Sequence, residues 1–316
     1  MATSTQQAAG EQRVVHEGCG LLDRSERGKL ALTGADAKSL LQGQVTNDVE
    51  ALTPGTGCYA ALLTPKGKML GDLRVLDTGT ELWLDTERAA LQAIFNVLHR
   101  ALLGADAVLH KRTLEQGLLS LVGPRARQVA GPAAAGLGDE HANANANVGG
   151  VDALLVATDL GVDLVCAAGD AGPLAGALVA NGAQPVSEQA AEVLRVERGR
   201  PRYGVELDDT VIPQEAGLND RAVSFTKGCY VGQETVARLH YKGKPNRHLR
   251  GLRLSAPADP GTPLVVDGRE VGRLGSSVLS PRLGPIGLAL VRREAPPGTT
   301  VAVGDGTTGE IVDLPF

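Results

Sequence analysis

The segment Lys227-Gly-Cys-Tyr-Val-Gly-Gln-Glu234 carries the densest set of reactive side chains in the chain. It combines an ammonium, a thiol, a phenol, an amide and a carboxylate, and its two glycines let the backbone turn and approach a ligand closely. If Cys229 lies at a helix N-terminus with Lys227 nearby, the positive field favours its thiolate and raises its reactivity. The alternative is a buried thiol that only packs. We expect Cys229 and Lys227 to be the catalytic residues.

The elements that position this segment alternate between strands and helices. Hydrophobic patterning and turn residues predict an α+β region over residues 13–241, made of two interleaved units with antiparallel sheets. The strands, helices and hairpin turn that we expect there are strand 28–34, helix 35–42, strands 59–63 and 68–76 around Thr64-Pro-Lys-Gly67, helix 88–103 and helix 187–198. A helix is expected to begin near Val231, at the end of the reactive segment.

Three further regions differ in composition. Residues 1–12 are polar and are predicted to form a disordered tail, and residues 131–150, which include Ala142-Asn-Ala-Asn-Ala-Asn147, are predicted to form a surface loop. From Arg247 onward, short β segments alternate with Pro and Gly turns, which is typical of a small barrel or sandwich. We therefore predict a C-terminal β-barrel over residues 246–316, after a boundary near residues 242–246.

Composition narrows the functional classes. A net charge of −5 over 316 residues disfavours a protein that coats nucleic acid. No window reaches the roughly 18 uninterrupted apolar residues of a membrane span, and the first residues lack the pattern of a signal peptide. The four cysteines are too scattered for a metal motif or a disulfide framework. These features predict a cytoplasmic protein with reduced thiols and without a metal site of its own.

The reactive segment and its continuation to Arg238 read K-G-C-Y-x-G-Q-E-x-x-A-R, which resembles the signature of the YgfZ family. Two upstream blocks, residues 41–48 (LQGQVTND) and residues 63–72 (LTPKGKMLGD), are similar to segments that YgfZ proteins share with the T-protein of the glycine cleavage system. The three blocks stand in the expected order. The resemblance covers residues 28–254, and beyond them only the β pattern is similar to the T-protein barrel.

This resemblance implies a T-protein-like ring of three domains, with ferredoxin-like α/β units, a C-terminal barrel, and a central hole that holds tetrahydrofolate or a one-carbon derivative. The segment 195–199 (RVERG) resembles the Arg-Leu-Glu-Ala-Gly of T-proteins, whose glutamate contacts the pterin, so Glu197 is the matching position. A carboxylate suits a pterin edge because it accepts two hydrogen bonds. A solvated ion pair is the alternative for Glu197. The implied folate-binding residues are Glu197, Arg195, Asp72, Tyr230, Gln233, Glu234 and Arg238.

One position departs from the T-protein pattern. T-proteins carry Asp-Asp where this chain has Gly71-Asp72. Loss of a carboxylate from a general acid–base site is expected to cost about 10²- to 10⁴-fold in rate. This departure weakens the expectation of aminomethyl transfer while leaving folate binding possible.

Three functions follow from the resemblance. The first is a tetrahydrofolate-binding protein that assembles or repairs iron–sulfur clusters, with client proteins or assembly factors as partners and Cys229 as its thiol. The second is a folate-dependent aminomethyltransferase, and the third is a non-catalytic module with structural folate. The basic residues between Arg238 and Arg253 could meet a folate polyglutamate tail, an acidic client or RNA, or could form a solvated linker.

Overall fold

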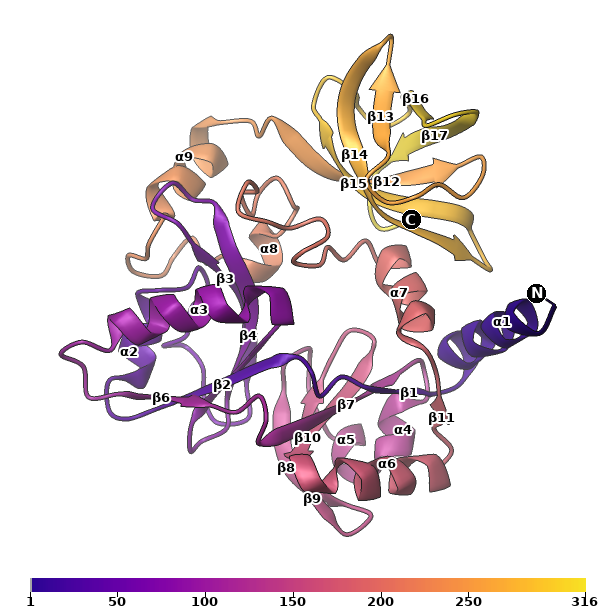
Figure 1. The fold of residues 1–316 in the computed structure, drawn as a ribbon. Helices are drawn as coiled ribbons and strands as arrows, with labels where there is room; N and C mark the ends of the chain where they lie inside the picture. The colour runs from indigo at the N-terminus through magenta and orange to yellow at the C-terminus, as the bar shows by residue number, and fades with distance from the viewer. Residues whose placement is uncertain (1) are drawn as a thin grey trace. The chain divides into compact units, whose positions relative to one another are not determined.

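The computed structural model describes residues 2–316, with side chains from residue 9 onward. The chain forms two compact units. The first unit comprises residues 1–63, 70–191 and 221–231, and the second comprises residues 64–69, 192–220 and 232–316. Figure 1 shows the ribbon of both. The predicted α+β class, with antiparallel sheets and a closed C-terminal barrel, is confirmed.

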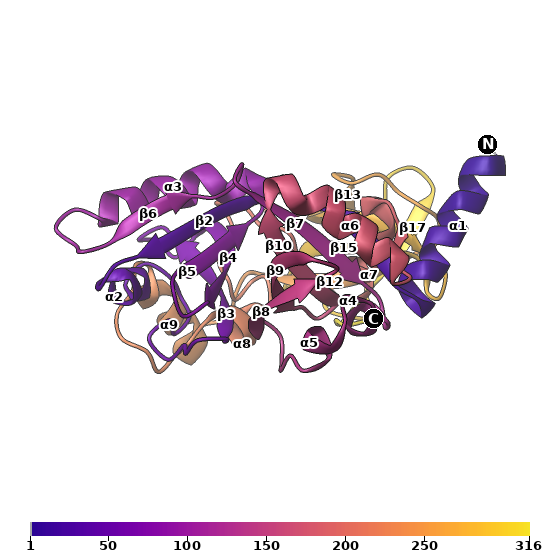
Figure 2. The same cartoon turned by 90° about the horizontal axis from the view of Figure 1, so that it is seen from below.

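The first unit holds a five-stranded sheet in the order β3-β4-β5-β2-β6. Helix α3 (Arg88–Ala101) covers one face of this sheet (Figure 2) and buries Ala90, Ile94 and Leu98 against it. This burial fits the apolar face that the sequence predicts for residues 88–103. The strands are β2 (Gly28–Thr33), β3 (Gly57–Leu63), β4 (Met69–Asp77), β5 (Leu82–Thr86) and β6 (Val108–Lys111), and helix α2 spans Ala37–Gln42.

A six-stranded sheet, in the order β11-β1-β7-β10-β9-β8, completes the first unit. One face packs beneath short helices through a core that includes Leu119, Leu155 and Leu164. The other face meets the five-stranded sheet, where Trp83 packs with Val165. The elements are β1 (Gly20–Asp23), β7 (Gln116–Val122), β8 (Asn143–Val148), β9 (Val151–Ala157), β10 (Gly161–Ala167), β11 (Gln184–Pro185), α4 (Ala126–Ala130), α5 (Pro132–Ala135), the 3-10 turn η1 (Ala168–Asp170) and α6 (Ala171–Ala180).

The surface loop expected over residues 131–150 is wrong in two places, because residues 132–135 form helix α5 and residues 143–148 form the edge strand β8. The Asn-Ala repeat has the period of a strand: Asn145 and Asn147 are exposed, while Ala144 and Ala146 pack against the core. Low complexity concealed this alternation, because alanine adds little apolar area.

The chain start also differs from the expected disordered tail. Residues 2–17 form helix α1 (Ala2–Glu17), so the prediction for residues 1–12 is wrong from residue 2 onward, and residue 1 lies outside the described residues. The helix has a tertiary anchor because Val15 is buried and Glu11 accepts a hydrogen bond from the Ser187 backbone nitrogen at 3.0 Å. Alanine, glutamine and glutamate, which recur along this helix, are good helix formers.

The second unit is built around the barrel, whose strand order is β12-β15-β14-β13-β16-β17. Its interior contains Leu252, Leu274 and Val301. The strands are β12 (Arg247–Leu254), β13 (Pro263–Val266), β14 (Arg269–Ser280), β15 (Gly284–Arg292), β16 (Thr300–Val303) and β17 (Thr307–Val312). Helix α9 (Gln233–Lys242) belongs to this unit. The chain passes from the first unit to the second within α7 (Glu188–Glu197) and returns to the first within α8 (Asn219–Ala222). Within the described residues, no helix is long and apolar enough to cross a membrane.

Candidate active site around Asp72

Lys227 lies in the first unit with its side chain buried inside the loop that follows α2. Its Nζ donates hydrogen bonds to the backbone carbonyls of Gln42 at 2.6 Å, Val45 at 2.7 Å and Asn47 at 2.9 Å. An ammonium has three hydrogens, so these carbonyls use all of them. Burial lowers the pKa of Lys227 to about 8, against the opposing field of Asp48. This arrangement favours a structural role for Lys227.

The same loop is tied to strand β3 and to the segment before Lys227. Thr46 Oγ1 donates to the carbonyl of Ala222 at 2.5 Å and accepts from the Ala61 backbone nitrogen at 2.8 Å. Asn47 Nδ2 donates to the carbonyls of Tyr59 at 2.8 Å and Arg221 at 3.2 Å. The structure therefore brings together the 41–48 block and the reactive segment.

Asp72, on β4, is a buried carboxyl with one partnered and one unpartnered oxygen. Tyr59, on β3, donates its phenolic hydrogen to Asp72 Oδ2 at 2.5 Å. Asp72 Oδ1 is buried and has no hydrogen-bond partner among the described residues. Burial raises the pKa of Asp72 to about 6, and Glu87 raises it further, while the Tyr59 hydrogen bond and Arg27 oppose the shift. A carboxyl with these properties can gain and lose a proton near neutral pH.

Gly71 explains the departure from the T-protein acid pair. A Cβ added at Gly71 would lie 2.8 Å from the Ala90 Cβ and 2.9 Å from Ile94 Cδ1, which is too close for any side chain. Because successive residues of a strand face opposite sides, position 71 points toward α3 and Asp72 points away from it. The missing carboxylate is therefore on the helix-covered face of β4, and its absence takes nothing from the face that carries Asp72.

Cys229 and Tyr230 follow Lys227 with contrasting environments. Cys229 is exposed, whereas Tyr230 is buried and its ring centroid lies 5.1 Å from Lys227 Nζ. Burial raises the pKa of Tyr230 to about 12. Helix α9 begins at Gln233, after Gly232 with φ of 85°, within two residues of the start expected near Val231. Cys229 thus precedes the first turn of that helix, which is a weaker position than the predicted helix N-terminus.

The field of Lys227 acts on a cysteine that the sequence did not single out. Cys58, on β3, is half-buried. Burial raises its pKa to about 12 despite the opposing charge of Lys227. The predicted influence of Lys227 on a thiol therefore exists at Cys58, and there burial outweighs it.

The remaining predicted site residues belong to the second unit. Arg195 is buried, and all five of its N–H hydrogens are used by Glu192, Glu206, Ser276 and the carbonyl of Arg200. This guanidinium is committed to internal contacts. Glu197 accepts a hydrogen bond from Ser280 Oγ at 2.5 Å. On α9, Gln233 is half-buried, while Glu234 and Arg238 are exposed.

The basic stretch divides into paired and exposed residues. Arg247 forms an ion pair with Glu215 at 3.0 Å, and Arg250 pairs with Asp313 at 2.6 Å. Lys242 and Lys244 are exposed on the surface. A polar pocket of about 530 Å³ in the same unit is lined by Lys68, Glu215, Asn246, Arg247, Arg292 and Glu294.

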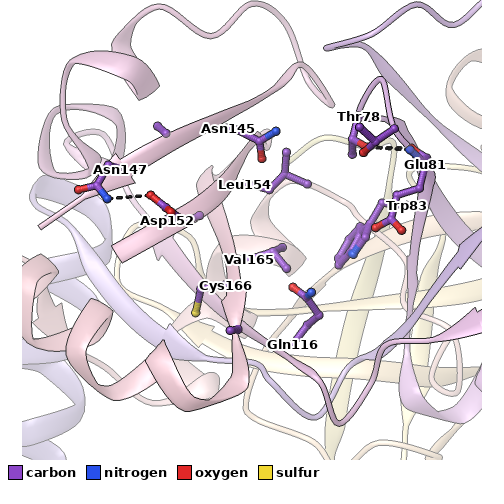
Figure 3. Close-up of a pocket in the computed structure, with 14 residues that line it drawn as sticks. Thr78, Glu81, Trp83, Gln116, Asn145, Asn147, Asp152, Leu154, Val165 and Cys166 are labelled. Carbon is purple, nitrogen blue, oxygen red and sulfur yellow. Dashed lines mark hydrogen bonds between the residues drawn. The ribbon is translucent and has the colours of Figure 1, made fainter. Parts of the chain in front are cut away.

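A second pocket, of about 590 Å³, lies in the first unit at the edge of the layer between the two sheets (Figure 3). Trp83, Leu154 and Val165 supply its apolar residues, and Gln116 and Asn145 are among its polar ones. None of the predicted site residues lines it. Among the described residues, no group of three or more His, Cys, Asp or Glu side chains could hold a metal ion.

Sequence reasoning missed Tyr59, Arg221 and Glu140. A signal for Tyr59 was present, because the predicted hairpin around residues 64–67 places positions 59 and 72 at similar distances from the turn. Arg221 was recognisable only as a charged residue near the reactive segment. Glu140 lay in the region that low complexity had marked as a loop.

Comparisons with known proteins agree with this fold. Residues 2–227 match the GCVT N-terminal domain, and residues 247–316 match the glycine cleavage T-protein C-terminal barrel domain. The chain belongs to the glycine cleavage T-protein family. The crystal structure of the aminomethyltransferase T from Bartonella henselae covers 98% of this chain, and 89% of that chain is covered, with a TM-score of 0.86 and 23% identity. This likeness shows the same fold.

Curated relatives are similar over nearly the whole chain. A putative chloroplastic transferase of Arabidopsis thaliana is 31% identical over 308 residues, which is 94% of this chain and 71% of the relative. An aminomethyltransferase of Rubrobacter xylanophilus is 31% identical over 318 residues, which is 97% of this chain and 85% of the relative. Aminomethyltransferases of this family use tetrahydrofolate as the one-carbon acceptor. The matches establish the T-protein family, and membership of its YgfZ branch stays a prediction.

Proposed function

We propose that this protein is a folate-dependent one-carbon transferase of the aminomethyltransferase type, with Asp72 as its general acid and base. The observation that carries the proposal is the buried Asp72 carboxyl, with Tyr59 on Oδ2 and, within the part of the chain that the structure describes, no partner on Oδ1. The similarity to aminomethyltransferases over almost the whole chain supports it. This reading takes precedence over the iron–sulfur hypothesis because position 71 faces α3, so the acid pair is no longer an argument against transfer.

The contacts of Asp72 determine where its proton is held. Because the Tyr59 hydroxyl donates to Oδ2, the acidic proton of Asp72 belongs on Oδ1, the buried oxygen that has no hydrogen-bond partner among the described residues. A pKa of about 6 makes both protonation states accessible near neutral pH. Tetrahydrofolate would supply the nitrogen nucleophile that accepts the one-carbon unit.

A single carboxyl can then serve first as proton donor and afterwards as proton acceptor. Transfer of the methylene carbon breaks two bonds of the aminomethyl donor, the C–N bond to the amino group and the bond to the carrier, and forms two C–N bonds to folate. Oδ1 of neutral Asp72 can donate the proton that the departing amino group needs to leave as ammonia. The two folate nitrogens release two protons: the resulting Asp72 carboxylate can accept one of them, and the departing carrier group takes up the other. Tyr59 holds the carboxyl in one orientation during both steps, and the loop around Lys227 fixes the backbone of Tyr59 through Asn47.

The test is the formation of methylenetetrahydrofolate from tetrahydrofolate and an aminomethyl donor. Asp72→Asn keeps the size of the side chain and an acceptor for Tyr59 but cannot exchange a proton, so the rate should fall by about 10²- to 10⁴-fold. Asp152→Asn, on an exposed part of β9, is the matched control and should retain full activity. Undiminished turnover by Asp72→Asn, or none by the natural protein, would refute the proposal.

The exposure of Cys229 supports a second proposal, the iron–sulfur function expected from the YgfZ resemblance. Cys229 is the exposed one of four cysteines, so it can meet a client protein or assembly factor. In a strain that lacks the natural protein, Cys229→Ala should fail to restore iron–sulfur enzyme activity while still binding folate. Cys166→Ala is the control, since that thiol is buried. Full rescue by Cys229→Ala would leave the thiol without this role. A cytoplasmic location also remains a prediction.

A further inference from the structure

We propose that the ion pair between Glu140 and Arg221 is a positioning device that orients and polarises Tyr59, and so decides which oxygen of Asp72 carries the proton. The inference rests on the proposed role of Asp72. It adds two residues that lie far apart in the sequence and that neither the reactive segment nor the family motifs include. The four residues Glu140, Arg221, Tyr59 and Asp72 all belong to the first unit.

Arg221 is held between a carboxylate and an aromatic ring. Its Nη2 donates to Glu140 Oε1 at 2.7 Å, and its guanidinium carbon lies 5.4 Å from the centroid of the Tyr59 ring. The Arg221 side chain is 27% exposed and that of Glu140 is 31% exposed, so water only partly screens the pair. The Arg221 carbonyl also accepts from Asn47 Nδ2, which in turn donates to the Tyr59 carbonyl. Arg221 and Tyr59 are therefore fixed relative to each other through both backbone and side chain.

Glu140 is presented by an unusual backbone turn. The next residue, His141, has φ of 74°, in the left-handed region that non-glycine residues rarely adopt. Its backbone nitrogen donates to the Ala157 carbonyl at 2.8 Å, and its ring is buried with Nδ1 unpartnered among the described residues. Such conformations cost free energy and persist where the surroundings enforce them. The strained turn at His141 is a second observation, independent of the ion pair, that the surrounding structure holds Glu140 in place.

A cation over the face of a phenol withdraws electron density and makes its hydroxyl a stronger donor. The electrostatics agree, because Arg221 and Arg27 both oppose the rise in the pKa of Tyr59 that burial and Asp72 cause. A stronger donor stabilises the carboxylate form at Oδ2 and keeps the exchangeable proton on Oδ1. The charged and titratable groups acting on Asp72 are Tyr59 from β3, Glu87 from the start of α3 and Arg27 from the turn before β2. Arg221 acts through Tyr59.

The experiment is a pH titration of the Asp72 carboxyl in the full-length protein, followed by ¹³C NMR with γ-labelled aspartate and assigned with Asp72→Asn. Glu140→Gln and Arg221→Gln should each raise the titration midpoint by on the order of half a pH unit, since Tyr59 becomes a weaker donor. Tyr59→Phe should raise it at least as much. Adding Arg221→Gln to Tyr59→Phe should cause no further change, because the phenol transmits the effect.

Arg24→Gln is the matched control, because it breaks the ion pair of Arg24 with Glu188 in the same unit and should leave the midpoint unchanged. Arg221→Lys keeps the charge and guards against a folding defect, and should give a smaller rise than Arg221→Gln. An unchanged midpoint in both Glu140→Gln and Arg221→Gln, with a shift in Tyr59→Phe, would overturn the proposal. The titration needs no turnover, so its outcome is separate from the test of the transferase proposal, which fails if Asp72→Asn is fully active or if the natural protein gives no turnover.

Discussion

Two buried aspartates on neighbouring strands of the same sheet show opposite behaviour. Asp85, on β5, accepts hydrogen bonds from Arg27 at 2.8 Å and from Arg74 Nε at 2.9 Å. Burial opposes its ionisation, yet the fields of Arg74 and Arg27 hold its pKa well below the usual range. The carboxyl of Asp72, on β4, accepts a hydrogen bond from the Tyr59 hydroxyl instead of from arginines, and burial raises its pKa to about 6. Burial is common to both, so the partners decide which carboxyl is permanently charged.

The two aspartates suit different roles, a structural one for Asp85 and a chemical one for Asp72. Arg74 also pairs with Asp163 at 2.7 Å, and Asp163 accepts from Ser120 at 2.6 Å, so the Asp85 network joins the two sheets of the first unit. Every charge in it has a counter-charge, which suits a permanent structural link. Among the described residues, Asp72 Oδ1 has no hydrogen-bond partner. An unsatisfied buried group costs free energy, which a purely structural role does not explain.

The largest expected effect is on stability at Asp85. Asp85→Asn would leave Arg27 and Arg74 buried without their common counter-charge, so the free energy of unfolding should fall by about 3–5 kcal/mol. Urea denaturation at neutral pH measures this change. If the variant lost less than about 1 kcal/mol, the network would not be the structural link that the comparison requires.

The second prediction concerns the pH dependence of stability at Asp72. A raised pKa in the folded state means that ionisation opposes folding above pH 6, while below the unfolded pKa of 3.8 the carboxyl is neutral in both states. Asp72→Asn should therefore stabilise the protein by roughly 1–3 kcal/mol at pH 8 and by almost nothing near pH 3. Asp85 has the opposite sign, since its contribution is present above its unfolded pKa and is lost as the pH falls. Unfolding curves across this range test both signs.

A third prediction concerns two residues of helix α7. Arg195 has every hydrogen engaged, whereas Glu197 has a carboxylate that the T-protein resemblance assigns to the pterin. Glu197→Ala should weaken tetrahydrofolate binding about tenfold, because a pterin donor left unpaired in a pocket costs roughly 1–3 kcal/mol. Calorimetry measures the affinity, with Ser280→Ala as the control for the contact that Glu197 already makes. Equal affinity in Glu197→Ala would remove this residue from the site.

The smallest effect is kinetic and concerns the cysteines. Burial raises the pKa of Cys19 to about 11 and that of Cys58 to about 12, whereas Cys229 is exposed. At neutral pH, Cys229 should therefore react with iodoacetamide faster than Cys19, Cys58 and Cys166. Timed labelling with peptide mass spectrometry measures the four rates. Faster labelling of Cys58 would show that Lys227 activates that thiol more than burial suppresses it.

Local patterns predicted most of the elements. The apolar face of α3 and the β segments of the barrel follow from their periodicity, because each side chain reports its own burial. A helix was expected over residues 187–198, and at its start Ser187 Oγ accepts a hydrogen bond from the Ala190 nitrogen at 3.4 Å. The motifs also singled out Asp72 and Lys227, which lie in the same unit, and their roles in a site stay predictions.

The environments of these residues depend on contacts between positions that lie far apart in the sequence. The sequence placed Lys227 beside Cys229, but only the fold shows that its ammonium is enclosed by carbonyls of residues 42–47. Gly71 was read as a lost acid, and the packing of α3 against it explains the glycine instead. Asp72 and Asp85 have the same side chain, and nothing local distinguishes the one beside a phenol from the one between two arginines.

The enclosure of Lys227 by residues 42–47 has a consequence for the order of events on the ribosome. The carbonyls of that loop emerge early in synthesis, yet the ammonium that gathers them is added more than a hundred residues later. Residues 221–231 complete the first unit after a segment of the second has already been made. The nascent chain must therefore hold its N-terminal sheets in an incomplete state during translation, when exposed apolar surface invites aggregation and chaperone binding.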